Sequence, residues 1–267
     1  MKDKLIIGRY LPLDTFVHRL DPRGKFIFVF IFIIVIFLSH HPYSYLWLAF
    51  ILLIILKVAR IPLGFLLKGL LPIFIFLLLT LVMHLFLTKG GTRLFEWGIL
   101  SIDSNGIREG ILIVLRLAYI MIISTLLTLT TSPLNLTEAF DRLFKPLKYI
   151  KVPVAALSMM MSIALRFIPT LMEELDKIVL SQKSRGSDIS SGSIVARIKA
   201  FIPLMIPLFI SAFQRAEELA IAMEVRGYDA NQQRTSYRVL EWHVKDTLAL
   251  LSIIPIAVIS IWLGHHF

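Results

Sequence analysis

Long apolar segments constrain this chain more than any other feature of its sequence. Each contains few or no charged residues, and with its flanking turns approaches the roughly 20 residues that a helix needs to cross a bilayer. Over the whole chain 57% of the residues are hydrophobic and the mean hydropathy is +0.79, far more than a soluble core needs. The sequence therefore predicts an all-α polytopic membrane protein with about five spanning helices. The expected spans are residues 26–38, 43–56, 63–87, 111–131 and 247–263.

Basic residues predict which side of the membrane each segment faces. The chain has 28 Lys and Arg against 18 Asp and Glu, a net charge of +10. Nearly all the Lys and Arg lie before residue 26, in the loop at 57–60, and across residues 132–245. Such loops remain cytoplasmic, so we expect a cytoplasmic N-terminus and an extracytoplasmic C-terminus. No nucleic-acid-binding motif accompanies the charge, and nucleic acid is not an expected partner.

The pattern of spans predicts three segments. Residues 1–131 would form an N-terminal membrane part with four spans, and residues 245–267 a C-terminal transmembrane helix. Residues 132–244 between them would form a cytoplasmic platform. It begins with a short amphipathic helix over 135–151, typical of a helix that lies at a membrane surface.

Two long amphipathic helices complete the predicted platform, over residues 153–186 and 196–227. Apolar residues recur along each at alternating steps of four and three, which is a heptad seam. Charged residues such as Arg166 and Arg215 keep off these seams. The seam residues are Leu157, Met161, Ala164, Ile168, Leu171, Leu175 and Ile178 on the first helix, and Met205, Phe209, Ala212, Ala216, Leu219 and Met223 on the second.

Each long helix ends in an X-Arg-Gly tripeptide. One explanation is an ordinary helix end, in which glycine follows the last turn and arginine complements the helix dipole. The other is a docking contact, in which an exposed arginine pairs with carboxylates or carbonyls of a partner and glycine allows close backbone approach. Two such ends on two long helices favour docking. The tripeptides are Ser184-Arg185-Gly186 and Val225-Arg226-Gly227.

Reactive groups are sparse. His84 and Arg116 are the main ionisable residues in the spans, and we interpret His84 as an interhelical hydrogen bonder and Arg116 as a structural residue that can snorkel. Gly24-Lys25 lacks the upstream glycine and the hydroxyl of a P-loop. The sequence has no cysteine and no His-Glu-x-x-His motif. We therefore expect no catalytic residue, no metal and no cofactor.

A string before the first span carries a family resemblance. His18-Arg19-Leu20-Asp21-Pro22-Arg23, taken with the two X-Arg-Gly tripeptides, resembles the T component (EcfT) of energy-coupling factor (ECF) transporters over nearly the whole chain. The family often has alanine before the arginine, where this chain has Ser184 and Val225. Within the string, Asp21-Pro22 is itself typical of a helix start, with Asp21 as N-cap.

The resemblance implies a transmembrane scaffold in an ATP-driven importer of vitamins or metal ions, in the cell membrane of a prokaryote. Two cytoplasmic ATPase subunits would dock on the X-Arg-Gly residues of the long helices. A small substrate-binding membrane protein, the S component, would rest on their apolar faces and be tipped when the ATPases close. The residues expected to contact it are Met159, Met160, Leu171, Leu175, Met205, Phe209, Ala212 and Ala216.

Several alternatives remain open. Consecutive methionines at 159–161 suit either an adaptable partner surface or plain core packing. A stand-alone channel or secondary transporter would need pore-lining polar residues or interrupted helices in matched halves, and only Pro72 and Pro255 suggest interruptions. A polytopic membrane enzyme would need an acid–base pair, which the sequence does not display. The substrate is not encoded in any motif, and the long N-terminal string favours a scaffold shared by several S components.

Overall fold

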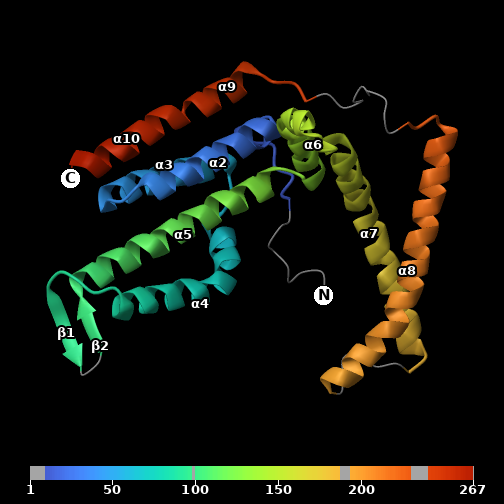
Figure 1. Cartoon of the computed structure of the whole chain (residues 1–267), viewed down its shortest axis with the longest axis horizontal. Coiled ribbons are helices and arrows are strands. Elements are labelled where there is room, and N and C mark those ends of the chain that lie inside the picture. The colour runs from blue at the N-terminus through green and yellow to red at the C-terminus, as the bar shows by residue number, and fades with distance from the viewer. Residues whose placement is uncertain (1–9, 98–99, 187–192, 230–239, 267) are drawn as a thin grey trace. The chain divides into compact units, whose positions relative to one another are not determined.

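The computed structural model describes residues 10–97, 100–186, 193–229 and 240–266 (Figure 1). Apart from one two-stranded hairpin, the elements in these ranges are helices, which confirms the predicted all-α class. In chain order they are α1 (Phe16–Arg19), α2 (Pro22–Leu38), α3 (Pro42–Ala59), α4 (Leu63–Leu87), β1 (Arg93–Trp97), β2 (Leu100–Asp103), α5 (Ser104–Thr130), α6 (Pro133–Phe144), the 3-10 helix η1 (Lys145–Ile150), α7 (Val154–Ser184), α8 (Ile194–Val225), α9 (Val244–Leu251) and α10 (Ile253–His266).

The chain divides into two compact units. Unit 1 combines Met1–Leu143 with Leu240–Phe267, and unit 2 is Phe144–Val239. The C-terminal helices thus pack with the N-terminal ones, and α6 belongs to unit 1, although the sequence grouped residues 132–143 with the platform. An edge contact between Phe26 and Phe140, with ring centroids 5.0 Å apart, helps hold α6 in unit 1.

Unit 1 is built around α2, α3, α5 and α10. Figure 1 shows α9 and α10 running alongside α3 and α2, with α4 beside α5. The core of the unit includes Phe32, Ile36, Tyr45, Leu48 and Ile123, all fully buried. Large apolar side chains also cover the outside of these helices, as expected of helices that face lipid.

Four of the described helices are long and apolar enough to cross a membrane. Pro42–Ala59, Ser104–Thr130 and Val244–Gly264 coincide with predicted spans. The fourth, Val154–Ser184, is α7, which the sequence assigned to the platform. These helices support a multi-pass membrane protein, while the number of five spans stays a prediction.

Local structure between α4 and α5 differs from the sequence expectation. The spans expected over 63–87 and 111–131 left residues 88–110 as a connection, but this connection contains the antiparallel pair β1–β2, and α5 begins at Ser104. The glycine at position 106 allows α5 to begin beside the end of α4. A Cβ at Gly106 would lie only 2.9 Å from the Thr88 carbonyl oxygen at the end of α4, which is too close for a side chain. The missing side chain therefore lets the first turn of α5 pack directly against the α4 backbone.

Two predicted helices are interrupted near prolines. The helix predicted over 135–151 ends as α6 at Phe144 and continues as η1, which holds Pro146 in its first turn. The last span is divided at Ser252, three residues before Pro255. Proline lacks the N–H that an α-helix needs and its ring crowds the carbonyl four residues earlier, so each break has a local cause.

Candidate functional site

Unit 2 contains the two long helices that the sequence singled out. α7 and α8 cross and pack against each other (Figure 1). At the crossing the Glu174 carboxylate accepts hydrogen bonds from Arg215 Nη2, at 3.3 Å, and from the Ser211 hydroxyl. Arg215 is half-buried there, although it lies off the apolar seam of α8. The crossing is thus partly polar, and an ion pair selects which residues of α7 and α8 meet.

The eight residues expected to contact an S component fall into two groups. Met160 is 63% exposed, Phe209 is 61% exposed, and Ala216 is exposed as well. The others are half-buried: Met159, Leu171, Leu175, Met205 and Ala212. Several exposed apolar residues of α8 were missed, including Ile206 and Phe213. The reason is that a heptad pattern detects a seam between helices, and part of that seam is occupied by the α7–α8 contact itself.

The end of α8 closes in a regular C-capping motif. Gly227 has φ +73° and donates its N–H to the Glu224 carbonyl at 2.8 Å, while the Tyr228 N–H bonds to the Met223 carbonyl at 2.9 Å. This pair of bonds is the Schellman arrangement. Only glycine adopts such a φ without strain, so the glycine is explained by backbone geometry.

The end of α7 is built in the same way within the described residues. Arg185 is the C-cap, and Gly186, at φ +83°, donates its N–H to the Lys183 carbonyl at 3.0 Å. A Cβ at Gly186 or at Gly227 would meet no described residue within 4 Å.

Capping explains the two glycines, but it does not explain the two arginines. Arg185 and Arg226 are exposed, and neither guanidinium has a polar partner in the part of the chain that the structure describes. Capping needs the glycine φ and backbone bonds, and it uses neither guanidinium. Among the described residues, each helix end therefore presents an unpaired fork of N–H donors that matches a carboxylate geometrically.

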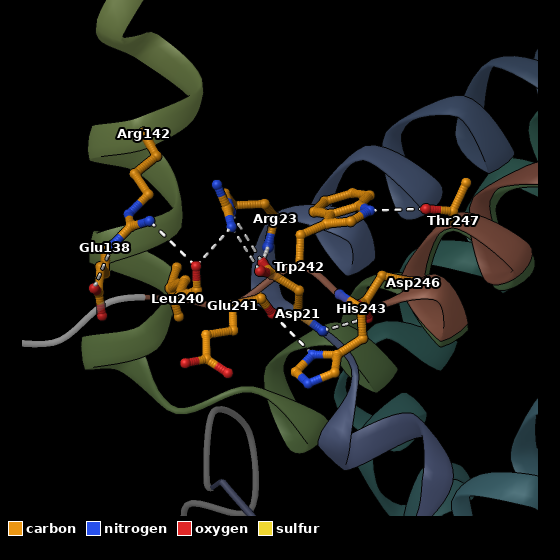
Figure 2. Close-up of polar contacts among 10 residues, drawn as sticks. All are labelled: Asp21, Arg23, Glu138, Arg142, Leu240, Glu241, Trp242, His243, Asp246 and Thr247. Carbon is orange, nitrogen blue, oxygen red and sulfur yellow. Dashed lines mark hydrogen bonds and ion pairs between the residues drawn. The ribbon is translucent and has the colours of Figure 1, made fainter.

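Residues 18–23 lie in unit 1, and Figure 2 shows Asp21 and Arg23 of this string beside the start of α9. Asp21 is the predicted N-cap of α2: its Oδ1 accepts the Arg23 N–H at 2.8 Å, and Pro22 is the first helical residue. The Arg23 guanidinium donates two hydrogen bonds, of 3.2 and 2.8 Å, to the same carboxylate. Asp21 is 5% exposed, so this pair is well shielded from solvent.

Asp246 joins this pair from 225 residues away in sequence. Its Oδ1 accepts the Asp21 N–H at 2.7 Å, and its Oδ2 accepts the His243 N–H at 2.8 Å. Arg23 and Arg142 both donate to the Leu240 carbonyl, at 3.1 and 3.3 Å. We call Asp21, Arg23, Leu240, His243 and Asp246 the N–C clamp, because they fasten the start of α2 to the start of α9. Asp246 was not predicted from the sequence, where its only local signal is its position three residues after the N-cap His243.

Comparison with known proteins places this arrangement in a family. The family described as "Cobalt transport protein" (CbiQ) matches residues 14–237. The energy-coupling factor transporter transmembrane protein EcfT of Staphylococcus aureus (strain 04-02981) is 65% identical over 97% of both chains. The chain belongs to the EcfT family. The EcfT proteins of Macrococcus caseolyticus and Bacillus subtilis are 53% and 46% identical, each over at least 98% of both chains. The resemblance stated from the sequence is thereby confirmed, and the chain is an ECF transporter membrane protein.

The rest of the string has structural contacts in this EcfT-family chain. The His18 Nδ1 lies 2.6 Å from the Thr15 hydroxyl, and burial together with the Lys25 charge lowers the pKa of the His18 imidazole. Arg19 pairs with Asp14, and its hydrogen bonds lower the pKa of that exposed carboxyl. The string therefore organises the N-terminal turn of the fold, apart from any contact it makes with other subunits.

The two ionisable residues that the sequence singled out in the spans, Arg116 and His84, also make contacts within the fold. Arg116 donates from Nε to the Tyr45 hydroxyl at 3.0 Å and from Nη2 to the Ser39 carbonyl at 3.2 Å, which ties α5 to the α2–α3 turn. His84 bonds at 3.1 Å to Thr88 at the end of its own helix, so the expected interhelical bond is not what the structure shows. In the described ranges no group of three or more His, Cys, Asp or Glu is arranged to hold a metal ion.

Proposed function

We propose that this chain is the transmembrane scaffold of an ECF-type importer, and that Arg185 and Arg226 are docking contacts for two cytoplasmic ATPase subunits. The observation that carries the proposal is the pair of exposed guanidiniums, without polar partners among the described residues, at the ends of two helices that pack together. The relatives' names support the coarser role, since each is the transmembrane protein of an energy-coupling factor transporter.

The α7–α8 crossing supplies a mechanical connection between the two docking points. Glu174 lies ten residues before Ser184, and Arg215 lies ten residues before Val225. Each helix end is therefore about 15 Å along its own axis from the ion pair. If an ATPase subunit shifts the end of one helix, that helix turns about the crossing and displaces the other helix. ATP hydrolysis by the partner subunits would in this way change the α7–α8 geometry without any catalytic group in the scaffold.

The exposed apolar faces of α7 and α8 are the proposed seat of the S component. Met160, Phe209 and Phe213 are each more than half exposed, and unbranched methionine adapts readily to different partners. A vitamin or a metal ion would be captured by that separate subunit. Movement of the two helices would then tip the S component in the membrane and release its substrate.

Co-purification tests the proposal directly. The tagged chain, expressed in a host that carries the other ECF subunits and extracted in mild detergent, should bring down two ABC-type ATPase subunits and a small membrane protein. An unrelated multi-pass protein with the same tag serves as the control. Recovery of the chain alone, together with transport by the chain alone in liposomes, would instead establish a stand-alone transporter.

The distribution of basic residues predicts the topology. With the N-terminus inside and five spans, a reporter that is active only outside the cytoplasm should be active when it is fused after Phe267. The same reporter fused after residue 229, within the proposed platform, is the matched control and should be inactive. An inactive fusion after Phe267 would contradict the five-span arrangement.

The isolated chain should bind no transported substrate with useful affinity. The reason is that capture belongs to the S component in this proposal, and the described ionisable groups of the spans are occupied by bonds within the fold. Calorimetry on the purified chain with vitamins and divalent metal ions should show no binding in the micromolar range. Micromolar binding of any of them would favour a secondary transporter.

A further inference from the structure

Unit 1 contains an apolar hollow of about 350 Å³. The size is that of a small-ligand pocket, which in proteins begins at roughly 300 Å³. Its floor consists of buried residues such as Val29, Ile123 and Leu126. Its lining also includes strongly exposed apolar residues, among them Ile54 and Leu248, the latter 61% exposed. The hollow is therefore open at one side, between α3 and α9, rather than sealed in the core.

The hollow lies at one end of the bundle. Its lining takes Gly24–Val29 from the start of α2, Ile54–Val58 from the end of α3, Ile123–Thr130 from the end of α5 and Asp246–Ala249 from α9. Three of these helices belong to the candidate spans Pro42–Ala59, Ser104–Thr130 and Val244–Gly264. The end of a bundle of spanning helices lies at the depth where lipid head groups begin. A bilayer lipid is thus the neighbour best placed to enter.

A second, polar hollow adjoins the first. The two share Phe16, Leu20 and Asp246 as common walls. The polar hollow is otherwise lined by Asp14, Thr15, Arg19, His243 and Lys245. An apolar compartment joined to a polar one is the shape that an amphiphile fits, with its chain in the first and its head group in the second.

The charged residues around the two hollows favour an anionic head group. Asp246 is committed to two backbone N–H groups of the N–C clamp, and Asp14 is paired with Arg19. The Lys25 ammonium lines the apolar hollow, donates to the His18 and Thr130 carbonyls at 2.9 Å and has the Asp246 and Asp21 carboxylates close by. In the polar hollow Asp14 balances Arg19, whereas Lys245 is exposed and has no ion pair among the described residues. A single phosphodiester would neutralise the Lys245 charge.

We infer that the paired hollows bind one anionic phospholipid of the surrounding bilayer. One acyl chain occupies the apolar hollow, and the phosphodiester lies in the polar hollow within reach of Lys245 and Arg19. The bound lipid fills the space between α1, α3 and α9 and rests against the N–C clamp. This site is separate from the helix ends and from the exposed faces of α7 and α8.

Native mass spectrometry of the full-length chain tests the inference with two probes, phosphatidylglycerol and phosphatidylcholine of identical acyl chains. We expect one phosphatidylglycerol to be retained per chain, about fivefold more tightly than phosphatidylcholine. Equal retention of both lipids would overturn the assignment of the head group. A chain dimer that excludes lipid would assign the hollow to a second copy and overturn the inference as a whole.

Two pairs of variants distinguish binding of the acyl chain from binding of the head group. Ala249→Phe fills the apolar hollow and should weaken retention of both lipids about tenfold, because excluding two methylene groups already has that effect. Ala155→Phe, on the exposed side of α7, is its control and should change nothing. Lys245→Gln should weaken phosphatidylglycerol alone about fivefold, whereas Lys57→Gln, exposed and outside both hollows, should not. Equal effects of a variant and its control would contradict the site.

Photo-crosslinking of the unmodified chain makes the test independent of how the variants fold. A phosphatidylglycerol with a diazirine in its acyl chain should label α2 near Phe28, α3 near Ile55 and α5 near Leu127, which line the hollow. Labels confined to outward-facing residues such as Phe30 and Leu46 would show only the general lipid boundary and would refute the inference.

Discussion

Replacing Arg185 and Arg226 together with alanine is expected to abolish transport while leaving the chain in the membrane. As docking residues, each loses a charge-assisted contact in a desolvated groove, and such a truncation costs about 2–5 kcal/mol of binding free energy. Either single substitution should weaken the coupling of ATP hydrolysis to uptake, and the pair should also loosen the ATPase subunits. Uptake and ATPase co-purification, measured on the same membranes for Arg185→Ala, Arg226→Ala and the double variant, provide the readout.

The same experiment distinguishes docking from simple capping. Loss of a dipole-complementing arginine costs at most about 1 kcal/mol of helix stability and would leave transport intact. Lys183→Ala removes an exposed positive charge two residues before Arg185 and serves as the matched control. Glutamate at either arginine should be worse than alanine, because it would set a like charge against the carboxylates proposed to pair with the arginine. Wild-type uptake by the double alanine variant would show that both tripeptides are only helix ends.

Asp246→Ala is expected to produce a large loss of stability in unit 1. Asp246 is 3% exposed, and its two oxygens satisfy the backbone N–H groups of Asp21 and His243. Removing the carboxylate leaves the Asp21 N–H buried without an acceptor, at about 1–3 kcal/mol, and also removes the bond of the part-buried His243 N–H, so we expect a loss of roughly 3 kcal/mol. The melting temperature of the purified chain in detergent should fall by several degrees.

Two further variants complete this test. Glu241→Ala removes an exposed carboxylate five residues earlier and should change the unfolding free energy by less than about 0.5 kcal/mol. Asp246→Asn keeps one carbonyl acceptor and should fall between wild type and Asp246→Ala. An Asp246→Ala protein as stable as Glu241→Ala would mean that the N–C clamp does not hold α2 to α9.

Much of the fold follows from local sequence, because a helix makes its hydrogen bonds within one continuous segment. The apolar runs therefore predicted the helices of unit 1, and Asp21-Pro22 marked the start of α2 to the residue. The same locality explains the ends of the long helices. Gly186 and Gly227 were expected just after the last turn, and both have the positive φ that only glycine tolerates well. The family, carried by short motifs, was also readable at this level.

The tertiary structure decided which of these local features meet. Nothing within a few residues of Asp21 indicates that its N–H bonds to Asp246, because the two lie far apart in the chain and are brought together by packing of α2 on α9. The heptad pattern placed Arg215 off the apolar seam, yet in the crossing of α7 and α8 it donates a hydrogen bond to Glu174. Gly106 carries no sequence sign of its contact with the α4 backbone. Hydrogen bonds within one segment could thus be predicted from the sequence. Contacts between segments depend on how the apolar helices pack, and apolar helices can often pack in more than one way.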